Sequence, residues 1–212
     1  MIKHPAKYTN SLLPVFKKYL DGRKLILDPF AGTGKLKDIA PTATLLEIEP
    51  EWAKISGAIV GDATAMPFPD NYFDAVCTSP TYGNRMADHF IDHQKEKNYI
   101  RNTYRSYLGR DLNENNSGRM QWGKKYQELH IKAWVECSRV LKGNGIFILN
   151  ISNHIRMGKE VDVTGWHKKE LEKIGFYLVA SNKIKTPRQR NGANSKARVG
   201  YESVLVFNNV TD

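Results

Sequence analysis

Three short, mostly apolar runs, each ended by a turn, constrain the fold of this chain more than any other feature. The runs are Leu25–Leu27, Ala43–Ile48 and Tyr72–Cys77. Short apolar runs bounded by turn residues predict buried strands. Strands that are buried on both faces are typical of a parallel sheet covered by helices. The pattern therefore predicts an α/β fold with a doubly wound sheet.

The first two runs end in residues suited to a nucleotide-like ligand. Asp28 and Pro29 lead into the glycine pair Gly32 and Gly34, and glycines allow a backbone to turn tightly and approach a ligand. A single Gly-x-Gly also fits an ordinary strand-to-helix turn. The second run adds Glu47, placed where an acidic side chain accepts hydrogen bonds from ribose hydroxyls. Its short spacing from Gly32 predicts a brief helix between the two strands.

The third run follows Gly61-Asp62-Ala63 and ends in the corner Ser79-Pro80-Thr81-Tyr82. Together these segments resemble the class I S-adenosylmethionine-dependent methyltransferases, and specifically the DNA amino-methyltransferases. In that family the corner is Asp, Asn or Ser, then Pro-Pro, then Tyr or Phe, and the serine version is associated with cytosine N4 methylation. The order of the motifs resembles the family's gamma arrangement, and the compact chain resembles small phage or prophage enzymes. The matches reach from His4 to Gly83 and continue more weakly to Phe207.

The resemblance implies a Rossmann-like class I methyltransferase fold, with a seven-stranded, mostly parallel sheet and an antiparallel C-terminal hairpin. It implies S-adenosyl-L-methionine as the cofactor, and the segment His4–Thr9 resembles the motif that contacts its methionine end. The implied catalytic residues are Ser79, Pro80 and Tyr82. The implied cofactor-binding residues are Lys7, Tyr8, Asp28, Phe30, Ala31, Gly32, Gly34, Glu47, Ile48, Asp62, Ala63 and Ser79.

The corner residues also suit this chemistry on physical grounds alone. An exocyclic base amine is a poor nucleophile because its lone pair is delocalised into the ring, and acceptors aimed at its hydrogens help it to rehybridise. The Ser79 hydroxyl and the Pro80 carbonyl are such acceptors. Tyr82 can stack on a base flipped out of a duplex, and stacking of about 1–3 kcal/mol offsets much of the cost of flipping. Thr81, in place of the second proline, predicts a looser corner with an extra N–H.

Methylation at cytosine carbon 5 and metal-dependent chemistry are not expected. The carbon-5 reaction needs a cysteine nucleophile, but Cys77 lies inside an apolar run and Cys137 lies on an apolar helix face with Trp134. Two separate cysteines do not make a zinc site. His89 and His93 share a helical spacing without a third ligand nearby, so no metal is predicted.

Length and composition favour a single domain spanning residues 1–212. A chain of 212 residues with 41% hydrophobic content can bury a sizeable core but has no room for a large target-recognition domain. No apolar stretch approaches the roughly 20 residues of a membrane span, and no signal peptide is apparent. We expect a soluble, cytoplasmic protein with no membrane partner, either a monomer or a homodimer.

The excess of positive charge falls in two predicted insertions, 83–125 and 182–198. The net charge is +10; the first insertion has nine Lys or Arg against five Asp or Glu, and the second has six against none. Concentrated positive charge is typical of segments that meet phosphates, although solvated loops are the alternative. The predicted nucleic-acid contacts are Arg85, Arg101, Arg105, Arg110, Arg119, Lys183, Lys185, Arg188, Arg190, Lys196 and Arg198.

The sequence also predicts a turn inside the first insertion and the order of helices and strands that follow it. The stretch Asn115–Gly118 is predicted to be an exposed turn, in a segment that we expect to order partly on the substrate. After Lys125, a helix through Trp134 is predicted to end at Lys142–Gly145. Asn153, His154 and Arg156 follow the next strand and are expected to line the pocket. A further helix over about 163–173 leads to the predicted hairpin.

The sequence therefore predicts methyl transfer to an exocyclic amine of DNA, with cytosine N4 ahead of adenine N6 because of Ser79. An RNA base methyltransferase is the alternative enzyme, since both nucleic acids present the same phosphates. An inactive protein that binds cofactor and nucleic acid is the alternative from another class, and Thr81 is its only support.

Overall fold

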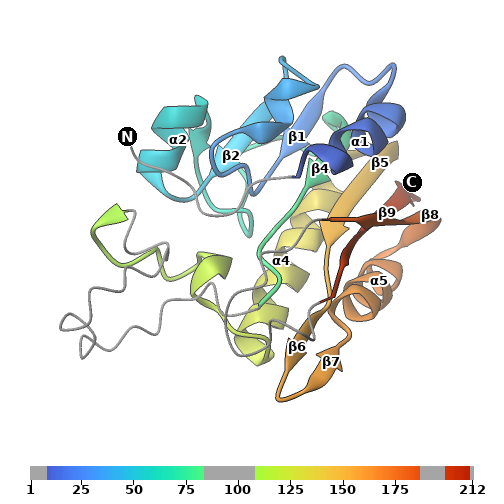
Figure 1. Cartoon of the computed structure of the whole chain (residues 1–212). Helices are drawn as coiled ribbons and strands as arrows, with labels where there is room; N and C mark the ends of the chain where they lie inside the picture. Colours follow the sequence, from blue (N-terminus) through green and yellow to red (C-terminus); the bar gives the residue numbers. More distant parts are fainter. Residues whose placement is uncertain (1–8, 84–107, 187–198, 211–212) are drawn as a thin grey trace.

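The structure is a computed structural model that describes residues 9–83, 108–186 and 199–210. One sheet has seven strands in the order β3-β2-β1-β4-β5-β9-β8 (Figure 1). Its strands are β1 Ile26–Asp28, β2 Thr44–Glu47, β3 Ile59–Val60, β4 Phe73–Thr78, β5 Leu141–Ile151, β8 Phe176–Lys185 and β9 Tyr201–Asn209. A second sheet pairs β6 His154–Arg156 with β7 Lys159–Val161. The helices are α1 Leu13–Leu20, α2 Pro50–Ser56, α4 Lys124–Val140 and α5 Val163–Ile174, with 3₁₀ turns η1 Asn10–Leu12, η2 Lys35–Asp38 and η4 Ser117–Arg119.

Strand pairing confirms the predicted fold class. Strands β3, β2, β1, β4 and β5 pair in parallel. Strand β9 is antiparallel to both β5 and β8, which forms the predicted C-terminal hairpin. The brief helix expected between the glycine pair and β2 is the single turn η2.

The two faces of the sheet carry separate apolar cores. Leu27 and Leu149 face one core with Trp134 of α4 and Leu171 of α5. Their strand neighbours Ile26, Ala75, Ile148 and Val206 face the other core, with Phe16 of α1 and Leu36 of η2. This alternation follows from the period of two in a strand. Helices on both faces make the sheet doubly wound (Figure 1).

Both cysteines are core residues, as predicted. Cys77 of β4 lies in the core that includes Phe16 of α1, and Cys137 of α4 lies in the core on the other face of the sheet; both are fully buried. Burial raises the pKa of both thiols well above the usual value, so neither is a ready nucleophile.

Two predicted boundaries change, and one predicted turn is only partly exposed. Helix α4 ends at Val140, and β5 pairing begins at Leu141, so Lys142–Gly145 lie within an irregular start of the strand and do not form a separate turn. Strand β8 extends to Lys185, because Asn182–Lys185 pair with β9, and the predicted second insertion begins later than residue 182. The predicted exposed turn Asn115–Gly118 holds only in part: Asn115 is exposed and lies in a turn, whereas Ser117 and Gly118 are buried in η4.

Within the described ranges 9–83, 108–186 and 199–210, no helix combines the length and the apolar character that a membrane crossing requires.

Candidate active site at the carboxyl edge of the sheet

The glycine turn after β1 is fastened to the end of β2. Gly32 and Gly34 both have positive φ values, of 53° and 77°. A Cβ atom on Gly34 would lie 2.9 Å from the Ser56 Cβ, so this position has neither the conformation nor the space for a larger residue. The Gly32 N–H donates to Glu47 Oε2 at 2.7 Å. The predicted cofactor residues Gly32 and Glu47 are therefore in direct contact.

Glu47 is held by backbone amides on both carboxylate oxygens. Its Oε1 accepts from the Glu49 N–H at 2.9 Å, and the residue is only 6% exposed. Burial raises the pKa of Glu47 to about 7, although the amides of Glu49 and Gly32 favour the charged form. The carboxyl group thus titrates near neutral pH at the point where a ribose is expected.

Two more predicted acidic residues lie at the ends of neighbouring strands. Buried Asp28 accepts from the Thr78 hydroxyl at 2.7 Å, which joins the carboxyl ends of β1 and β4. Asp62 follows β3, and its Oδ1 accepts from the N–H and hydroxyl of Thr64, both at 2.8 Å. Its Oδ2 accepts from the Asn115 side-chain amide at 2.7 Å.

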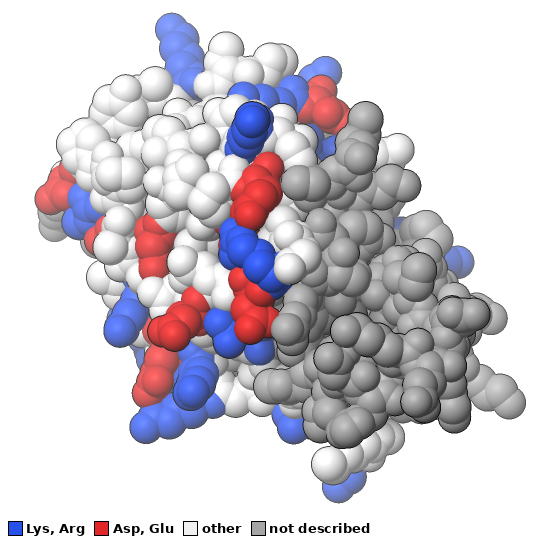
Figure 2. Space-filling model, turned by 90° about the vertical axis from the view of Figure 1, so that its left-hand side faces the viewer, with Lys and Arg blue, Asp and Glu red and all other residues white. Residues whose placement is uncertain are grey.

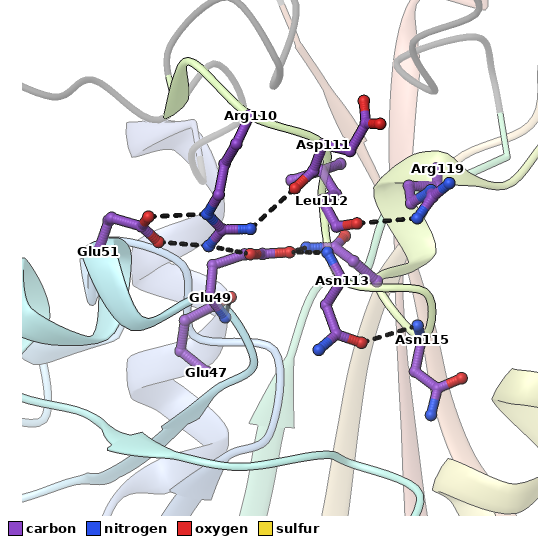
Figure 3. Close-up of polar contacts among 10 residues, drawn as sticks. Glu47, Glu49, Glu51, Arg110, Asp111, Leu112, Asn113, Asn115 and Arg119 are labelled. Carbon is purple, nitrogen blue, oxygen red and sulfur yellow. Dashed lines mark hydrogen bonds and ion pairs between the residues drawn. The ribbon is translucent and has the colours of Figure 1, made fainter.

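A group that the sequence did not predict lies beside Glu47, and we call it the anchor cluster: Glu49, Arg110, Asn113 and Asn116. The Glu49 carboxylate accepts from Arg110 Nη2 at 2.7 Å, the Asn113 N–H at 2.7 Å and Asn116 Nδ2 at 2.9 Å. Figure 3 shows Arg110 lying between Glu49 and Glu51, which also accepts from it. The Glu49 side chain is fully buried, whereas that of Arg110 is 40% exposed. The anchor cluster therefore fastens residues 110–116 to the loop after β2.

The predicted catalytic corner belongs to a second group, which we call the corner cluster: Ser79, Tyr82, Asn150 and Glu202. The Ser79 and Tyr82 hydroxyl oxygens lie 3.3 Å apart. Asn150 Nδ2 lies 3.0 Å from Ser79 Oγ and 2.9 Å from the Tyr82 hydroxyl. Glu202 Oε2 accepts from Tyr82 at 2.9 Å and from Asn150 at 2.6 Å. Asn150 and Glu202 were not predicted as site residues. The only signal in the sequence was Asn150 itself, a polar residue within the apolar run of β5.

Thr81, which was expected to loosen the corner, has two hydrogen-bond partners in the structure. The Tyr126 hydroxyl donates to the Thr81 carbonyl at 2.8 Å, and the Thr81 hydroxyl donates to Ser117 Oγ at 3.0 Å. The Trp134 N–H donates to His167 Nδ1, which leaves His167 Nε2 to donate to Tyr126 at 3.0 Å. Burial lowers the pKa of His167, in keeping with this neutral form.

One tripeptide joins these parts of the edge. Asn115 contacts Asp62, Asn116 contacts Glu49, and Ser117 contacts Thr81. Consecutive residues of one segment thus reach the ends of β3, β2 and β4. Gly83 packs against Trp122, where a Cβ atom would lie 2.9 Å from the Trp122 backbone nitrogen.

The predicted nucleic-acid contacts fall into three groups. Arg110 binds two carboxylates and Arg119 donates to the Leu112 carbonyl, so these two guanidinium groups make intramolecular contacts. Lys183 and Lys185 lie on the exposed face of β8. Basic and acidic side chains are interspersed on the face shown in Figure 2. Outside the described residues lie Arg85, Arg101, Arg105, Arg188, Arg190, Lys196 and Arg198, together with the cofactor candidates Lys7 and Tyr8 and the histidines His89 and His93.

The pocket residues expected after β5 have other partners. Asn153 donates to Glu160 at 2.7 Å, and its Oδ1 accepts from the Thr164 N–H at 2.8 Å, near the start of α5. Arg156 donates to the Trp122 carbonyl at 3.1 Å. Among the residues that the structure describes, no group of three or more His, Cys, Asp or Glu side chains is arranged to hold a metal ion.

The acidic edge fits the chemistry of S-adenosylmethionine. That cofactor presents ribose hydroxyls, an adenine amine, an ammonium group and a sulfonium, all of which are hydrogen-bond donors or cations. Asp28, Glu47 and Asp62 place three carboxyl groups at the ends of adjacent strands β1, β2 and β3. The glycine turn between Asp28 and Glu47 allows close approach of the backbone.

Solved structures with this fold confirm the class I methyltransferase architecture. The chain is similar to a SAM-dependent methyltransferase from Methanosarcina mazei, with a TM-score of 0.58, 11% identity and coverage of 94% of this chain and 98% of that one. It is also similar to a SAM-dependent methyltransferase from Thermotoga maritima, a possible histamine N-methyltransferase (TM-score 0.56, 16% identity, coverage 95% and 88%). The cyclase SpnF is similar as well (TM-score 0.60, 15% identity, coverage 95% and 81%). Neither a protein-family model nor a curated protein sequence matches the chain.

Proposed function

We propose that this protein is an S-adenosylmethionine-dependent methyltransferase that acts on an exocyclic amine of a nucleic-acid base, with DNA cytosine N4 as the first candidate. The single observation that carries the proposal is the corner cluster at the end of β4. Ser79 follows Thr78, whose hydroxyl donates to Asp28 of the acidic edge, and the Tyr82 hydroxyl lies 3.3 Å from Ser79 Oγ. Methyltransferases among the structural neighbours support the cofactor, whereas the cyclase among them means that fold alone does not identify the reaction.

Each part of the edge has a task in this proposal. S-adenosylmethionine, when bound, supplies an activated methyl group. Glu47 accepts hydrogen bonds from ribose hydroxyls, and Asp62 accepts from the adenine amine. Ser79 Oγ and the Pro80 carbonyl accept hydrogen bonds from the target amine, so that its lone pair is freed from the ring. Tyr82, half-buried beside Ser79, supports the face of the base.

The nucleic acid is proposed to contact the predicted basic residues that the anchor cluster does not use. Of the described residues these include Lys183 and Lys185 on β8. Replacing both with glutamine is expected to weaken binding and to reduce the slope of log K against log salt by at most about 2 for duplex DNA. Lys168→Gln with Lys173→Gln, on α5, is the matched control, because those two lysines form ion pairs with Glu172 and Glu170. An unchanged slope would mean that Lys183 and Lys185 are solvated side chains that do not contact the nucleic acid.

The test of the whole proposal is transfer of tritium from labelled S-adenosylmethionine to unmethylated genomic DNA or to structured RNA, followed by nucleoside mass spectrometry. N4-methylcytosine in DNA is the expected product. N6-methyladenine would keep the enzyme class and change the target base, and label only in RNA would change the substrate. Cofactor binding with no transfer to any nucleic acid would favour an inactive binding protein.

A further inference from the structure

Two residues distant in sequence are brought to the catalytic corner by strand register. Thr78 of β4 pairs with Leu149 of β5, so Ser79 and Asn150 are the next residues of two adjacent parallel strands. Asn150 lies opposite Val204 of β9, and Glu202 is two residues from Val204. Because alternate residues share one face of a strand, Asn150 and Glu202 lie on the same side of the sheet.

Both side chains are buried among polar partners. Asn150 is fully buried and Glu202 is 5% exposed. The Asn150 amide nitrogen lies within 3.0 Å of Ser79 Oγ, the Tyr82 hydroxyl and Glu202 Oε2. Burying a carboxylate and an amide inside a sheet costs free energy unless both are hydrogen-bonded; Glu202 Oε2 and the Asn150 nitrogen have partners, whereas Asn150 Oδ1 has none among the described residues. Their hydrogen bonds converge on the two side chains that carry the proposed chemistry.

The chemical types of these groups set the direction of the hydrogen bonds. An ionised carboxylate only accepts, so the Tyr82 hydroxyl donates its proton to Glu202. The Tyr82 oxygen is then an acceptor 3.3 Å from Ser79, and the Ser79 proton can point toward it. Asn150 donates to one lone pair of Ser79, and the remaining lone pair can accept an N–H from a substrate.

We infer that Asn150 and Glu202 are positioning residues that keep the Ser79 oxygen oriented as an acceptor for an exocyclic amine and hold the Tyr82 ring in place. The inference deepens the proposed function and rests on it. It assigns a purpose to two buried polar residues, on the fifth and ninth strands, that lie outside the motif of the corner. Neither residue needs to touch the substrate.

The experiment compares Glu202→Gln, Glu202→Asp, Tyr82→Phe and the double variant Tyr82→Phe/Glu202→Gln with the wild-type protein. Glutamine keeps the size of Glu202 but replaces the charged carboxylate by one neutral acceptor oxygen and one donor amide, which weakens or reverses the bond from Tyr82, whereas aspartate keeps the charged acceptor. Glu128→Gln is the matched control, because Glu128 is exposed on α4 and pairs with Lys124 at 3.6 Å. The readouts are kcat, KM for the nucleic acid, cofactor Kd, and the NMR signal of the Tyr82 ring carbon that bears the hydroxyl, assigned with Tyr82→Phe.

We expect Glu202→Gln to lower kcat at least about tenfold with cofactor Kd within twofold, Glu202→Asp to recover part of kcat, and Glu128→Gln to resemble wild type. Because one hydrogen bond joins Tyr82 and Glu202, kcat of the double variant should be no lower than kcat of the worse single variant. Wild-type kcat in Glu202→Gln, or additive losses in the double variant, would overturn the inference. If Glu202→Gln does not fold, Tyr82→Phe tests the same bond, and wild-type kcat there would overturn the inference too.

The NMR signal separates this inference from the proposed function. Should the wild-type protein transfer no methyl group to DNA or RNA, the proposed function fails. The Tyr82 signal still tests the positioning: a changed signal in Glu202→Gln, but not in Glu128→Gln, supports the hydrogen bond that sets the orientation. An unchanged signal in Glu202→Gln overturns the inference whether or not the protein is active.

Discussion

The anchor cluster and the corner cluster are each built around a buried carboxylate, but their partners differ. Glu49 is paired with the guanidinium of Arg110, a charge that balances it. The contacts of Glu202 include hydrogen bonds that it accepts from the neutral groups of Tyr82 and Asn150. A carboxylate paired with a cation is suited to fastening a segment, whereas a carboxylate that binds hydroxyl and amide groups fixes the direction of their protons. The same side-chain chemistry thus serves attachment in one region and orientation in the other.

The largest expected effect comes from the corner cluster. Ser79→Ala or Tyr82→Ala should lower turnover about 100- to 1,000-fold, because each removes a group preorganised for the target base. Cofactor Kd, measured by calorimetry, should stay within about threefold, since neither change alters Glu47. Glu47→Ala is the contrasting variant and should raise the cofactor Kd. Equal loss of cofactor affinity in all three variants would contradict separate roles for the corner cluster in catalysis and for Glu47 in cofactor binding.

The anchor cluster should respond mainly in stability. Arg110→Met removes the cation from buried Glu49, and we expect it to lower the free energy of unfolding by about 1–3 kcal/mol, less than for a fully buried pair because Arg110 is partly exposed. Urea denaturation gives this value, and kcat should change little where the variant is folded. Arg119→Met, which removes a bond to the Leu112 carbonyl, is the control and should cost less. A loss of kcat without loss of stability would contradict the attachment role.

Glu47 is a third buried carboxyl group, and it is expected to make the stability of the protein depend on pH. Its pKa of about 7 lies above the usual value of 4.5, so the folded protein binds a proton that the unfolded chain releases. The contribution of Glu47 to stability is therefore fully present below about pH 4.5 and is lost as the pH rises through about 7. Glu47→Gln removes this titration. We expect its free energy of unfolding, relative to wild type, to increase from pH 5 to pH 8; a constant difference would contradict the raised pKa.

The smallest expected effect is at Thr81, which links the two regions through Ser117. Thr81→Val removes one hydroxyl and keeps the shape of the side chain, so it should cost about 0.5–1.5 kcal/mol of stability. Thermal unfolding measures this change, with Ser117→Ala as the partner in a double-mutant cycle. Since Tyr126 still holds the Thr81 carbonyl, kcat should fall less than tenfold. Additive costs in the cycle would mean that the two hydroxyls do not interact.

The sequence predicted the parts of the site that local patterns encode. Gly32, Glu47 and Ser79 each lie at or within a few residues of the end of an apolar run, so the ends of the strands could be read without knowing the sheet. Asn150 and Glu202 could not be found in this way, because their meeting depends on the register of β5 against β9. The carboxylate partners of Arg110 were missed for a related reason: a count of charges does not show that Glu49, 61 residues away, lies opposite it.

The tripeptide Asn115–Ser117 has a consequence for how this chain can change in length. Its three residues contact the ends of three different strands in succession, so their spacing is fixed to a single residue. A one-residue insertion or deletion inside it would misplace at least one of the contacts with Asp62, Glu49 and Thr81. Insertions and deletions in descendants of this sequence are therefore expected outside 115–117. The length of the tripeptide itself should stay constant, because it matches the spacing of the strand ends along the carboxyl edge of the sheet.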